Sequence, residues 1–365
     1  MRRCGLPSWW ALGLCLLNSA VAAATGGASE LRPDEQVILY PALGRAVAGG
    51  WELNLHGIVY QPARHRVLTK LMRRALGIDE GKLTLAEKAV FRERAAYFFV
   101  DDKRGRQLSL SVAGRSLPLG TSEADGHFEA LALFVSGELP AAPAATSLCL
   151  PGSIATRGGG RRELKLELEF LEDKGLSVIS DIDDTIKISD VRKKPELAMN
   201  TFCRSFRPVP GMAEVYGRWA RAGARFHYVS ASPWQLYLPL SEFTRSNGFP
   251  AGTFHLKSVR VKDTTFFSLF TSPERYKPPV IEELFRLFPN RRYVLVGDSG
   301  EKDPEIYGAL ARKHPRQVRK IFIRDVTDEA GDAARFEKAF RDLPGGLWEV
   351  FTAPGQIQWS PTVLD

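Results

Sequence analysis

The sequence has few of the residues that form disulfides in small domains or bind soft metals. Only 4 of its 365 residues are cysteine and only 6 are histidine. Cys4 and Cys15 lie in an N-terminal segment that we expect to be removed, which leaves Cys149 and Cys203. The spacing of these two has no metal-site pattern, although they could pair in an oxidising compartment. The 365 residues are enough for two domains with hydrophobic cores of their own.

A long apolar run is also missing beyond the N-terminus, so no later stretch is expected to span a membrane. Residues 1–24 have the features of a secretory signal peptide: a basic start at 2–3 and an apolar run over 9–17. Small residues at 20–24 supply cleavage sites, although an uncleaved anchor is the alternative. We therefore expect an exported protein, periplasmic or secreted, without a transmembrane span after signal cleavage.

Neither sign of charge dominates the composition. Charged residues make up 25% of the chain and hydrophobic residues 44%, as in ordinary soluble globular proteins. The formal net charge is +8, and it falls to +6 when the two arginines of residues 1–24 are removed. This mild basic excess suits an anionic substrate or a membrane surface, and we do not expect a nucleic-acid partner.

The region from about residue 30 to 172 is predicted to be a β-rich N-terminal domain. Apolar residues alternate with polar ones along several stretches, most clearly from 164 to 170. A helical insert interrupts the strands: residues 67–76 have helical spacing, and Thr84 with Glu87 forms a capping-box pattern before a second helix. A β-sandwich of roughly immunoglobulin size fits this pattern, and we see no chemistry in it.

From about residue 175 to 352 the pattern changes to alternating strands and helices, which predicts a doubly wound parallel sheet. In such sheets the ligand lies beyond the carboxyl ends of the strands. Asp181 and Asp183, Ser230, and Asp298 follow three of the expected strands, so they should converge. The expected strands are 176–182, 225–230, 293–297 and 318–323, and the expected helices are 211–222, 234–246, 279–288 and 304–313.

The first of these strands ends in crowded carboxylates. Asp181, Asp183 and their neighbour at 184 repel one another unless a cation lies among them, and oxygen ligands favour Mg²⁺. An EF-hand loop is excluded, because Ile186 and Arg192 stand where it needs glycine and glutamate. A solvated acidic turn is the other alternative.

A second acidic loop follows the strand at 293–297. Asp303 precedes Pro304, which also fits a capping role at a helix start. Lys277 precedes the helix expected at 279–288, where a cation opposes the helix dipole unless an anion lies between them. A surface lysine is the alternative for Lys277, and Lys257 is its rival as the lysine of the site.

These residues resemble the four motifs of the haloacid dehalogenase (HAD) superfamily, in order. The stretches 229–234 and 297–307 are further similar to the phosphatidate phosphatase catalytic-domain family of the yeast actin-patch protein, a lipin-related and capless group. This resemblance covers roughly 175–330 and implies a HAD-like Rossmannoid parallel sheet. The motif residues are Asp181, Asp183 and Thr185, then Ser230, Lys277, and Gly297-Asp298 with Asp303.

The resemblance also implies a mechanism with Mg²⁺ as cofactor. Asp181 would be the nucleophile and Asp183 the general acid and base. Thr185, Ser230 and Lys277 would bind the substrate, and Ser230 and Lys277 would also act in catalysis. The implied metal ligands are Asp181, Asp183 through its backbone carbonyl, Asp298 and Asp303.

The gaps between the motifs are too short for a full cap, so the site should admit a bulky substrate. The loops at 192–207 and 260–270 mix cations with aromatic residues, which suits peripheral contact with an anionic membrane, although the aromatic side chains could instead pack on the core. A Mg²⁺-dependent phosphatidate phosphatase is the leading hypothesis. The alternatives are a HAD phosphatase for another phosphomonoester and a non-catalytic phosphatidate-binding module, against which the presence of both Asp181 and Asp183 argues.

Overall fold

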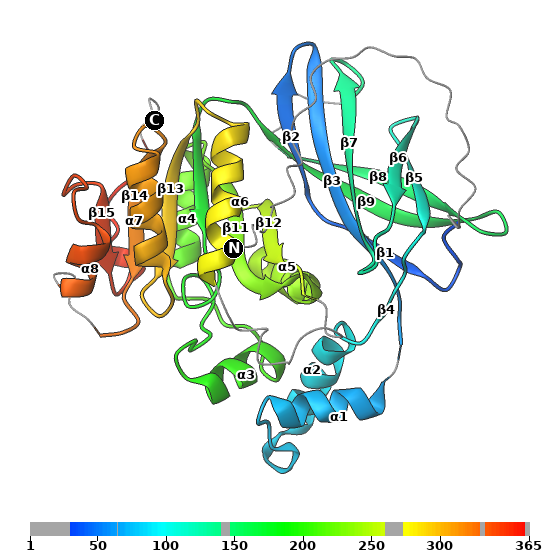
Figure 1. Cartoon of the computed structure of the whole chain (residues 1–365), viewed down its shortest axis with the longest axis horizontal. Helices are drawn as coiled ribbons and strands as arrows, with labels where there is room; N and C mark the ends of the chain where they lie inside the picture. Colours follow the sequence, from blue (N-terminus) through cyan, green and yellow to red (C-terminus); the bar gives the residue numbers. More distant parts are fainter. Residues whose placement is uncertain (1–29, 64, 140–146, 260–272, 329–332, 362–365) are drawn as a thin grey trace, which may run out of the picture.

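The computed structural model describes residues 30–63, 65–139, 147–259, 273–328 and 333–361. A curled β-sheet and a parallel α/β sheet lie side by side, and two helices of the N-terminal half lie below them in Figure 1. Within the described residues, no helix combines the length and apolarity needed to cross a membrane. The expected signal peptide at 1–24 and the loop at 260–270 lie outside the described residues.

The N-terminal strands form one nine-stranded sheet with the order β1-β3-β2-β9-β8-β5-β6, and β4 and β7 also pair with β3. The sheet curls until β6 lies beside β7, so the two separate stacked sheets of the predicted sandwich are not seen in the described part of the chain. The strands are β1 Gln36–Leu39, β2 Ala42–Val47, β3 Gly50–Gln61, β4 Asp101–Asp102, β5 Gln107–Val112, β6 Arg115–Thr121, β7 His127–Val135, β8 Ser147–Thr156 and β9 Gly160–Leu171.

The alternation predicted over 164–170 is confirmed as far as Leu168 and ends at Glu169, which is buried. In β9, Leu166 and Leu168 are fully buried whereas Glu167 between them is exposed. Successive side chains of a strand point to opposite faces, so this pattern places the apolar residues on the inside of the curl. Cys149 and Cys203, whose pairing the sequence left open, are both free thiols. Cys149 is exposed on β8, whereas Cys203 is buried in the second half of the chain.

The helical insert between β3 and β4 is confirmed as α1 Arg66–Ala75 and α2 Leu85–Ala96, joined through the short helix η1 Glu80–Lys82. The capping box forms as predicted: the backbone N–H of Glu87 donates to Oγ1 of Thr84 (3.2 Å), and the backbone N–H of Thr84 donates to the Glu87 carboxylate (2.9 Å). It satisfies donors at the start of α2 that the helix itself cannot satisfy.

The second half forms the predicted parallel sheet, with the strand order β12-β11-β10-β13-β14-β15. One hydrophobic cluster, with α4 and α5, covers one face, and another, with α6, α7 and α8, covers the other. The strands are β10 Leu176–Ser180, β11 Arg225–Pro233, β12 Gly252–Lys257, β13 Arg292–Asp298, β14 Val318–Arg324 and β15 Trp348–Phe351. The helices are α3 Lys194–Phe202, α4 Met212–Arg221, α5 Tyr237–Ser246 (preceded by η2 Trp234–Leu236), α6 Pro273–Leu287, α7 Asp303–Lys313 and α8 Ala334–Ala339, with η4 Pro354–Gln356 near the end.

One predicted helix boundary is wrong. The helix expected over 279–288 begins earlier, at Pro273, and contains Pro278 and Pro279. A proline lacks the N–H of an ordinary helical residue, and pattern rules therefore place it at a helix start. Lys277 consequently lies within α6 rather than before it. The expected conflict between its charge and the N-terminal end of the helix dipole therefore does not explain its position.

The aromatic residues of the 192–207 loop pack on the core, as the alternative reading expected. Phe202 is buried, and the guanidinium of Arg94 from α2 lies 3.8 Å from the ring centroid of Phe206. Arg192 and Lys194 are exposed. This loop therefore offers charge at the surface but not the exposed aromatic side chains that membrane contact would need.

One hydrophobic cluster includes residues from both sheets, while the inside of the N-terminal sheet forms a cluster of its own. The ring of Tyr40, from the N-terminal region, stacks on Trp234 with centroids 4.1 Å apart, and it meets Tyr237 edge-on at 4.8 Å. His56 packs against the same Trp234 ring, and its Nε2 lies 2.9 Å from Nδ1 of His127. The N-terminal sheet therefore packs directly against the segment that follows Ser230.

Candidate active site

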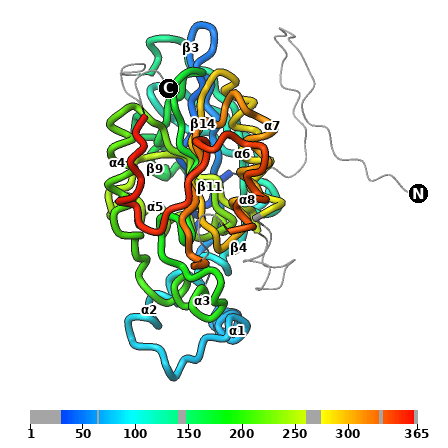
Figure 2. The backbone as a smooth tube through the Cα atoms, turned by 90° about the vertical axis from the view of Figure 1, so that its left-hand side faces the viewer, coloured from blue at the N-terminus to red at the C-terminus, as the bar shows by residue number. Residues whose placement is uncertain are grey.

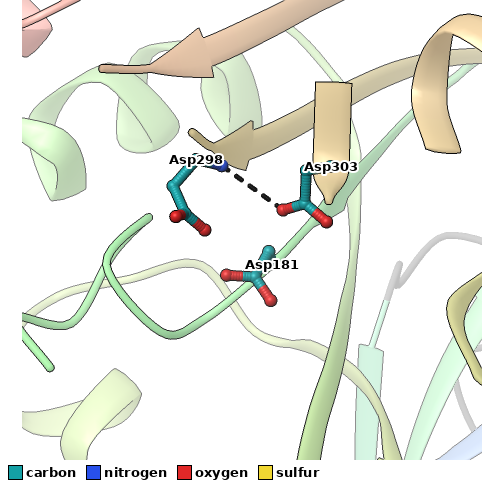
Figure 3. A group of neighbouring side chains, drawn as sticks. All are labelled: Asp181, Asp298 and Asp303. Carbon is teal, nitrogen blue, oxygen red and sulfur yellow. Dashed lines mark hydrogen bonds between the residues drawn. The ribbon is translucent and has the colours of Figure 1, made fainter. Parts of the chain in front are cut away.

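The polar residues at the strand ends converge as predicted. Asp181 directly follows β10, Asp298 ends β13, and Asp303 begins α7. One carboxylate oxygen from each lies within 4.8 Å of the others, and all three side chains are buried (Figure 3). Parallel strands bring their carboxyl ends to one edge of the sheet, so residues far apart in sequence meet there.

Lys277 extends from α6 into this group. Its Nζ lies 2.8 Å from Oδ1 of Asp181 and 2.6 Å from Oδ1 of Asp303. A fourth carboxylate, that of Glu301, lies 3.3 Å from the same nitrogen. Burial opposes the charge of the ammonium group, but Asp181 and Asp303 outweigh it and hold the pKa of Lys277 well above its usual range. Lys257, the predicted rival, ends the edge strand β12, two strands away from β10.

Asp183 is surrounded by different partners. Its Oδ1 accepts a hydrogen bond from Ser189 (2.6 Å) and pairs with Lys187 (2.7 Å). Its Oδ2 accepts hydrogen bonds from Ser232 (2.8 Å) and Ser230 (3.3 Å). Burial alone would raise the pKa of Asp183, but the ion pair with Lys187 and the hydrogen bonds together lower it to about 2.

The pKa of Asp181, two residues earlier, is shifted in the opposite direction. Burial raises its pKa to about 7, because the attraction of Lys277 is opposed by the carboxylates of Glu301 and Asp183. Thr185 donates a hydrogen bond to Oδ2 of Asp181 (3.0 Å) and is itself fully buried. Thr185 was predicted to bind substrate, and in the structure it orients Asp181.

Ser230 lies within β11, at a point where the pairing with β12 shifts register before Pro233. Such an irregularity re-aims side chains locally. The backbone N–H of Ser232 donates to Oγ of Ser230 (3.0 Å), and both hydroxyls point at Asp183. Sequence reasoning missed Ser232, although its place two residues after Ser230, on the same face of a strand, was a usable signal.

Asp184 organises the loop that carries the site. Its backbone has a positive φ of 55°, a conformation that aspartate tolerates better than most residues. Its carboxylate accepts hydrogen bonds from the backbone N–H groups of Ser189 (2.7 Å), Asp190 (2.9 Å) and Val191 (2.7 Å). Arg324 donates to its carbonyl oxygen (2.6 Å). The third aspartate of the run therefore has a structural role that sequence reasoning missed.

The donor set fits a hard cation. Oδ2 of Asp298 is buried and has no hydrogen-bonding partner in the described part of the chain, while Oδ1 accepts from the backbone N–H of Gly300 (2.7 Å). Burial, and then the charges of Asp303 and Asp181, raise the pKa of Asp298 well above its usual range. Mg²⁺ prefers oxygen ligands such as carboxylates. The carboxylates of this group outnumber its cations, so the group carries negative charge that a bound Mg²⁺ would neutralise.

Asp303 does not cap its helix as the alternative reading proposed. The residue at the N-cap position of α7 is Lys302, and the Asp303 carboxylate turns back to accept a hydrogen bond from the backbone N–H of Asp298 (3.3 Å; Figure 3). Gly297 leaves the space for it: a Cβ at that residue would lie 2.3 Å from Oδ2 of Asp303. The glycine before Asp298 is therefore required by the close approach of a carboxylate.

A cavity of about 540 Å³ opens beside these residues. Asp181 is not part of its lining and is only 1% exposed. Basic residues outnumber acidic ones in its lining, which suits an anionic ligand. The polar lining includes Asp183, Ser230, Ser232 and Glu301, and the basic residues are Arg192, Lys194, Lys302 and Arg335.

Comparison with known proteins supports the predicted resemblance. Residues 176–325 match the family model described as "Phosphatidate phosphatase APP1, catalytic domain". The chain is 27% identical over 291 residues to the protein named Phosphatidate phosphatase APP1 of Saccharomyces cerevisiae, an alignment that covers 68% of this chain and 49% of that one. It is 30% identical over 168 residues to an uncharacterized protein of Schizosaccharomyces pombe, covering 45% of this chain and 27% of that one.

The chain thus spans about half or less of the length of both relatives. The resemblance to the phosphatidate phosphatase APP1 family, predicted from the motifs, is confirmed. A solved structure of a protein of unknown function from Porphyromonas gingivalis W83 was also matched. The alignment covers 41% of this chain and 60% of that chain, with 9% sequence identity. Its TM-score of 0.16 is too low to bear on the fold.

Proposed function

We propose that this protein is a Mg²⁺-dependent phosphatidate phosphatase, which hydrolyses phosphatidate to diacylglycerol and phosphate through an aspartyl-phosphate intermediate. The observation that carries the proposal is the buried group of Asp181, Asp298 and Asp303 around Lys277, beside an open cavity at the carboxyl end of a parallel sheet. The match of residues 176–325 to the phosphatidate phosphatase family supports the substrate class.

The proposed chemistry has two displacements at phosphorus. A carboxylate oxygen of Asp181 attacks the phosphorus, and the bond from phosphorus to the glycerol oxygen breaks while Asp183 gives that oxygen its proton. A water then gives a proton back to Asp183 and attacks the phosphorus, which breaks the bond to Asp181 and releases phosphate. Lys277 and Ser230 donate hydrogen bonds to the phosphoryl oxygens.

Asp181, Asp298, Asp303 and the backbone carbonyl of Asp183 would hold the Mg²⁺, which when bound supplies positive charge to the phosphoryl oxygens. The fit rests on the unpartnered Oδ2 of Asp298 and on the excess of carboxylates over cations. In the proposed cycle Asp183 must exchange its ion pair with Lys187 for a proton before it can act as an acid. Asp181 is covered, so neighbouring side chains must move before phosphorus reaches its oxygen.

The shape of the site supports a bulky substrate. The chain between β10 and β11 forms α3 and α4, and α5 and β12 follow β11. Of these described elements, α4, α5 and β12 belong to the sheet and its covering helices, whereas the short helix α3 packs on α2 beside the cavity. The headgroup of a lipid could enter the 540 Å³ cavity while its acyl chains stay outside. Export, predicted from residues 1–24, remains a prediction that mass spectrometry of the mature N-terminus tests.

The experiment is a measurement of phosphate release from phosphatidate in mixed micelles, from lysophosphatidate and from p-nitrophenyl phosphate, each with Mg²⁺ and with EDTA. The proposal expects Mg²⁺-dependent turnover that is fastest on phosphatidate. Faster turnover of a soluble phosphomonoester would favour the second hypothesis. Binding of phosphatidate without any phosphate release would favour the binding-module hypothesis.

A further inference from the structure

Helix α1 presents apolar side chains to solvent. Val67 is 72% exposed, Leu68 41% and Leu71 49%, whereas Met72, one turn after Leu68, is buried in the core. Exposed apolar side chains are unremarkable when single, but a contiguous group on one helix marks a surface that contacts something else. The apolar face of the helix is therefore only partly covered: Met72 packs on the protein, while Val67, Leu68 and Leu71 are left at the surface.

A row of cations runs beside this apolar face. Arg66, Lys70 and Arg74 are spaced four residues apart, as are the neighbouring Val67 and Leu71, so the two sets form adjacent rows along the helix. The helix contains no acidic residue. Apolar side chains flanked by lysine and arginine are the pattern of helices that lie in the interface of an anionic membrane.

The charge continues into the groove between α1 and α2. This groove has a volume of about 780 Å³ and five arginine or lysine residues in its lining. The acidic residue among them is Glu80, which pairs with Arg73 at 2.5 Å. The basic groups in the lining are Arg66, Lys70, Arg73, Lys88 and Arg92. The groove therefore suits anionic groups, such as lipid phosphates.

The insert is attached to the rim of the candidate active site. Arg94 of α2 donates hydrogen bonds to the carbonyl oxygens of Thr201 (2.7 Å) and Arg204 (2.8 Å), and Thr201 is part of the lining of the 540 Å³ cavity. Helices α1, α2 and α3 lie together at one end of the molecule in both views (Figures 1 and 2). A flat anionic surface touching α1 would thus lie on the side of the molecule where the cavity is found.

We propose that α1 is the docking surface for an anionic lipid bilayer, with Val67, Leu68 and Leu71 inserted among the lipids and Arg66, Lys70 and Arg74 at the headgroups. This inference rests on the proposed function for its purpose, since the bilayer is where a phosphatidate substrate is found. The basic charge selects the occupant: a second copy of this chain would bring the same cations together and repel.

The test is co-sedimentation of the mature full-length protein with phosphatidylcholine vesicles, with and without phosphatidylserine. Phosphatidylserine is a phosphodiester, so its binding does not depend on the proposed hydrolysis of a monoester. The variants are Val67→Ser/Leu71→Ser and Arg66→Gln/Lys70→Gln/Arg74→Gln. The matched control is Leu131→Ser/Leu133→Ser, which removes side chains that are 59% and 62% exposed on β7, a strand that runs to the opposite end of the molecule (Figure 1).

We expect native protein and control to bind vesicles that contain phosphatidylserine. The triple glutamine variant should bind roughly a hundredfold more weakly, since each cation at an anionic surface contributes about a tenfold factor or somewhat less. The double serine variant should lose about tenfold or more, and increasing salt should weaken the native protein more than the triple variant.

Equal binding by native protein and both α1 variants would overturn the proposal, as would an equal loss in the control. The absence of native binding to any vesicle would overturn it in favour of a protein partner for α1. Melting temperatures check that each variant is folded. Failure of the proposed function would look different: no phosphate release from any monoester, with vesicle binding unaffected.

Discussion

Two groups of buried charges in this molecule use the same kinds of residue in opposite ways. In the N-terminal region, Glu35 is fully buried and accepts hydrogen bonds from Arg106, among them Nη2 to Oε1 (2.6 Å) and Nε to Oε2 (2.7 Å). The backbone N–H of Arg32 also donates to the Glu35 carboxylate (2.9 Å). One negative charge meets one positive charge, and the geometry is bidentate.

The group around Lys277 is not balanced. Four carboxylates, those of Asp181, Asp298, Glu301 and Asp303, surround one ammonium group. The pKa directions reflect the difference: that of Glu35 is lowered, because hydrogen bonds from Arg106 and Arg32 overcome burial, whereas that of Asp298 is raised. A matched buried pair contributes to structure, and an unmatched group of carboxylates could hold a metal ion.

The largest effect is expected from Asp181→Asn. Removing the proposed nucleophile should lower Mg²⁺-dependent phosphate release by three orders of magnitude or more, because a positioned nucleophile typically contributes about that much. The melting temperature should change little, since the exchange relieves repulsion within the unbalanced group. Circular dichroism and an assay on the same sample check both halves. Retention of more than about a tenth of native turnover by folded protein would contradict the assignment.

Glu35→Gln should have the opposite effect: a loss of stability with turnover retained. It leaves Arg106 buried without its counter-charge, which typically costs about 3–5 kcal/mol of unfolding free energy, while turnover of folded protein is kept. Urea unfolding measures the loss, and the double variant Glu35→Gln/Arg106→Gln should be less unstable than the single one. A normal stability with lost activity would mean that the pair serves the site.

The same pair carries a pH dependence. The folded pKa of Glu35 lies below its ordinary value of 4.5, so its contribution to stability is present above pH 4.5 and is lost as the pH falls through the folded pKa. Glu35→Gln should therefore flatten the decline of unfolding free energy below that pH. Parallel urea titrations at several pH values test the slope, and an unchanged slope would show that other groups set it.

Mg²⁺ should stabilise the unbalanced group specifically. At a concentration about a hundredfold above its dissociation constant, a ligand adds about 2.7 kcal/mol to the unfolding free energy. This gain should be seen in the native protein and in Glu35→Gln, and it should largely disappear in Asp298→Asn. Thermal melts with Mg²⁺ and with EDTA measure it without any assay of activity. An equal gain in Asp298→Asn would place the ion elsewhere.

The smallest effect is expected from Ser232→Ala. This exchange removes one of several hydrogen bonds to Asp183, and a bond to a charged group contributes about 1.5–3 kcal/mol, so kcat should fall by about tenfold or somewhat more. Alanine at the exposed position 205, Ser205→Ala, is the matched control and should leave kcat unchanged. A kcat equal to that of native protein would show that Ser232 does not orient Asp183 during the reaction.

Much of the parallel sheet could be predicted from the sequence, because the patterns that mark its strands and helices are local. An apolar strand that ends in a polar residue identifies a strand exit, and one edge of a parallel sheet collects all of them. That is how Asp181, Ser230 and Asp298 could be grouped without a structure. The sequence also identified the capping box at Thr84, since its two hydrogen bonds join residues three positions apart.

Other features depend on contacts that no local pattern encodes. The N-terminal strands form a single sheet because β2 pairs in parallel with β9, which joins residues from the two ends of that region. The roles of Asp184 and Glu301 depend on where each side chain points after the loops have folded. The exposed part of the apolar face of α1 was missed because helical periodicity shows that Leu68 and Leu71 are on one face, and not whether that face is covered.

The stacking of Tyr40 on Trp234 has a consequence for where this chain can be divided. The match to the family model begins at residue 176, but the packing that supports the segment after Ser230 begins well before it. A fragment cut at residue 176 would expose Trp234 and Tyr237 and would lose the rings that pack on them. The N-terminal sheet is thus a structural part of the unit that carries the candidate site, and exchanging it between relatives would require both sides of this aromatic contact to be exchanged together.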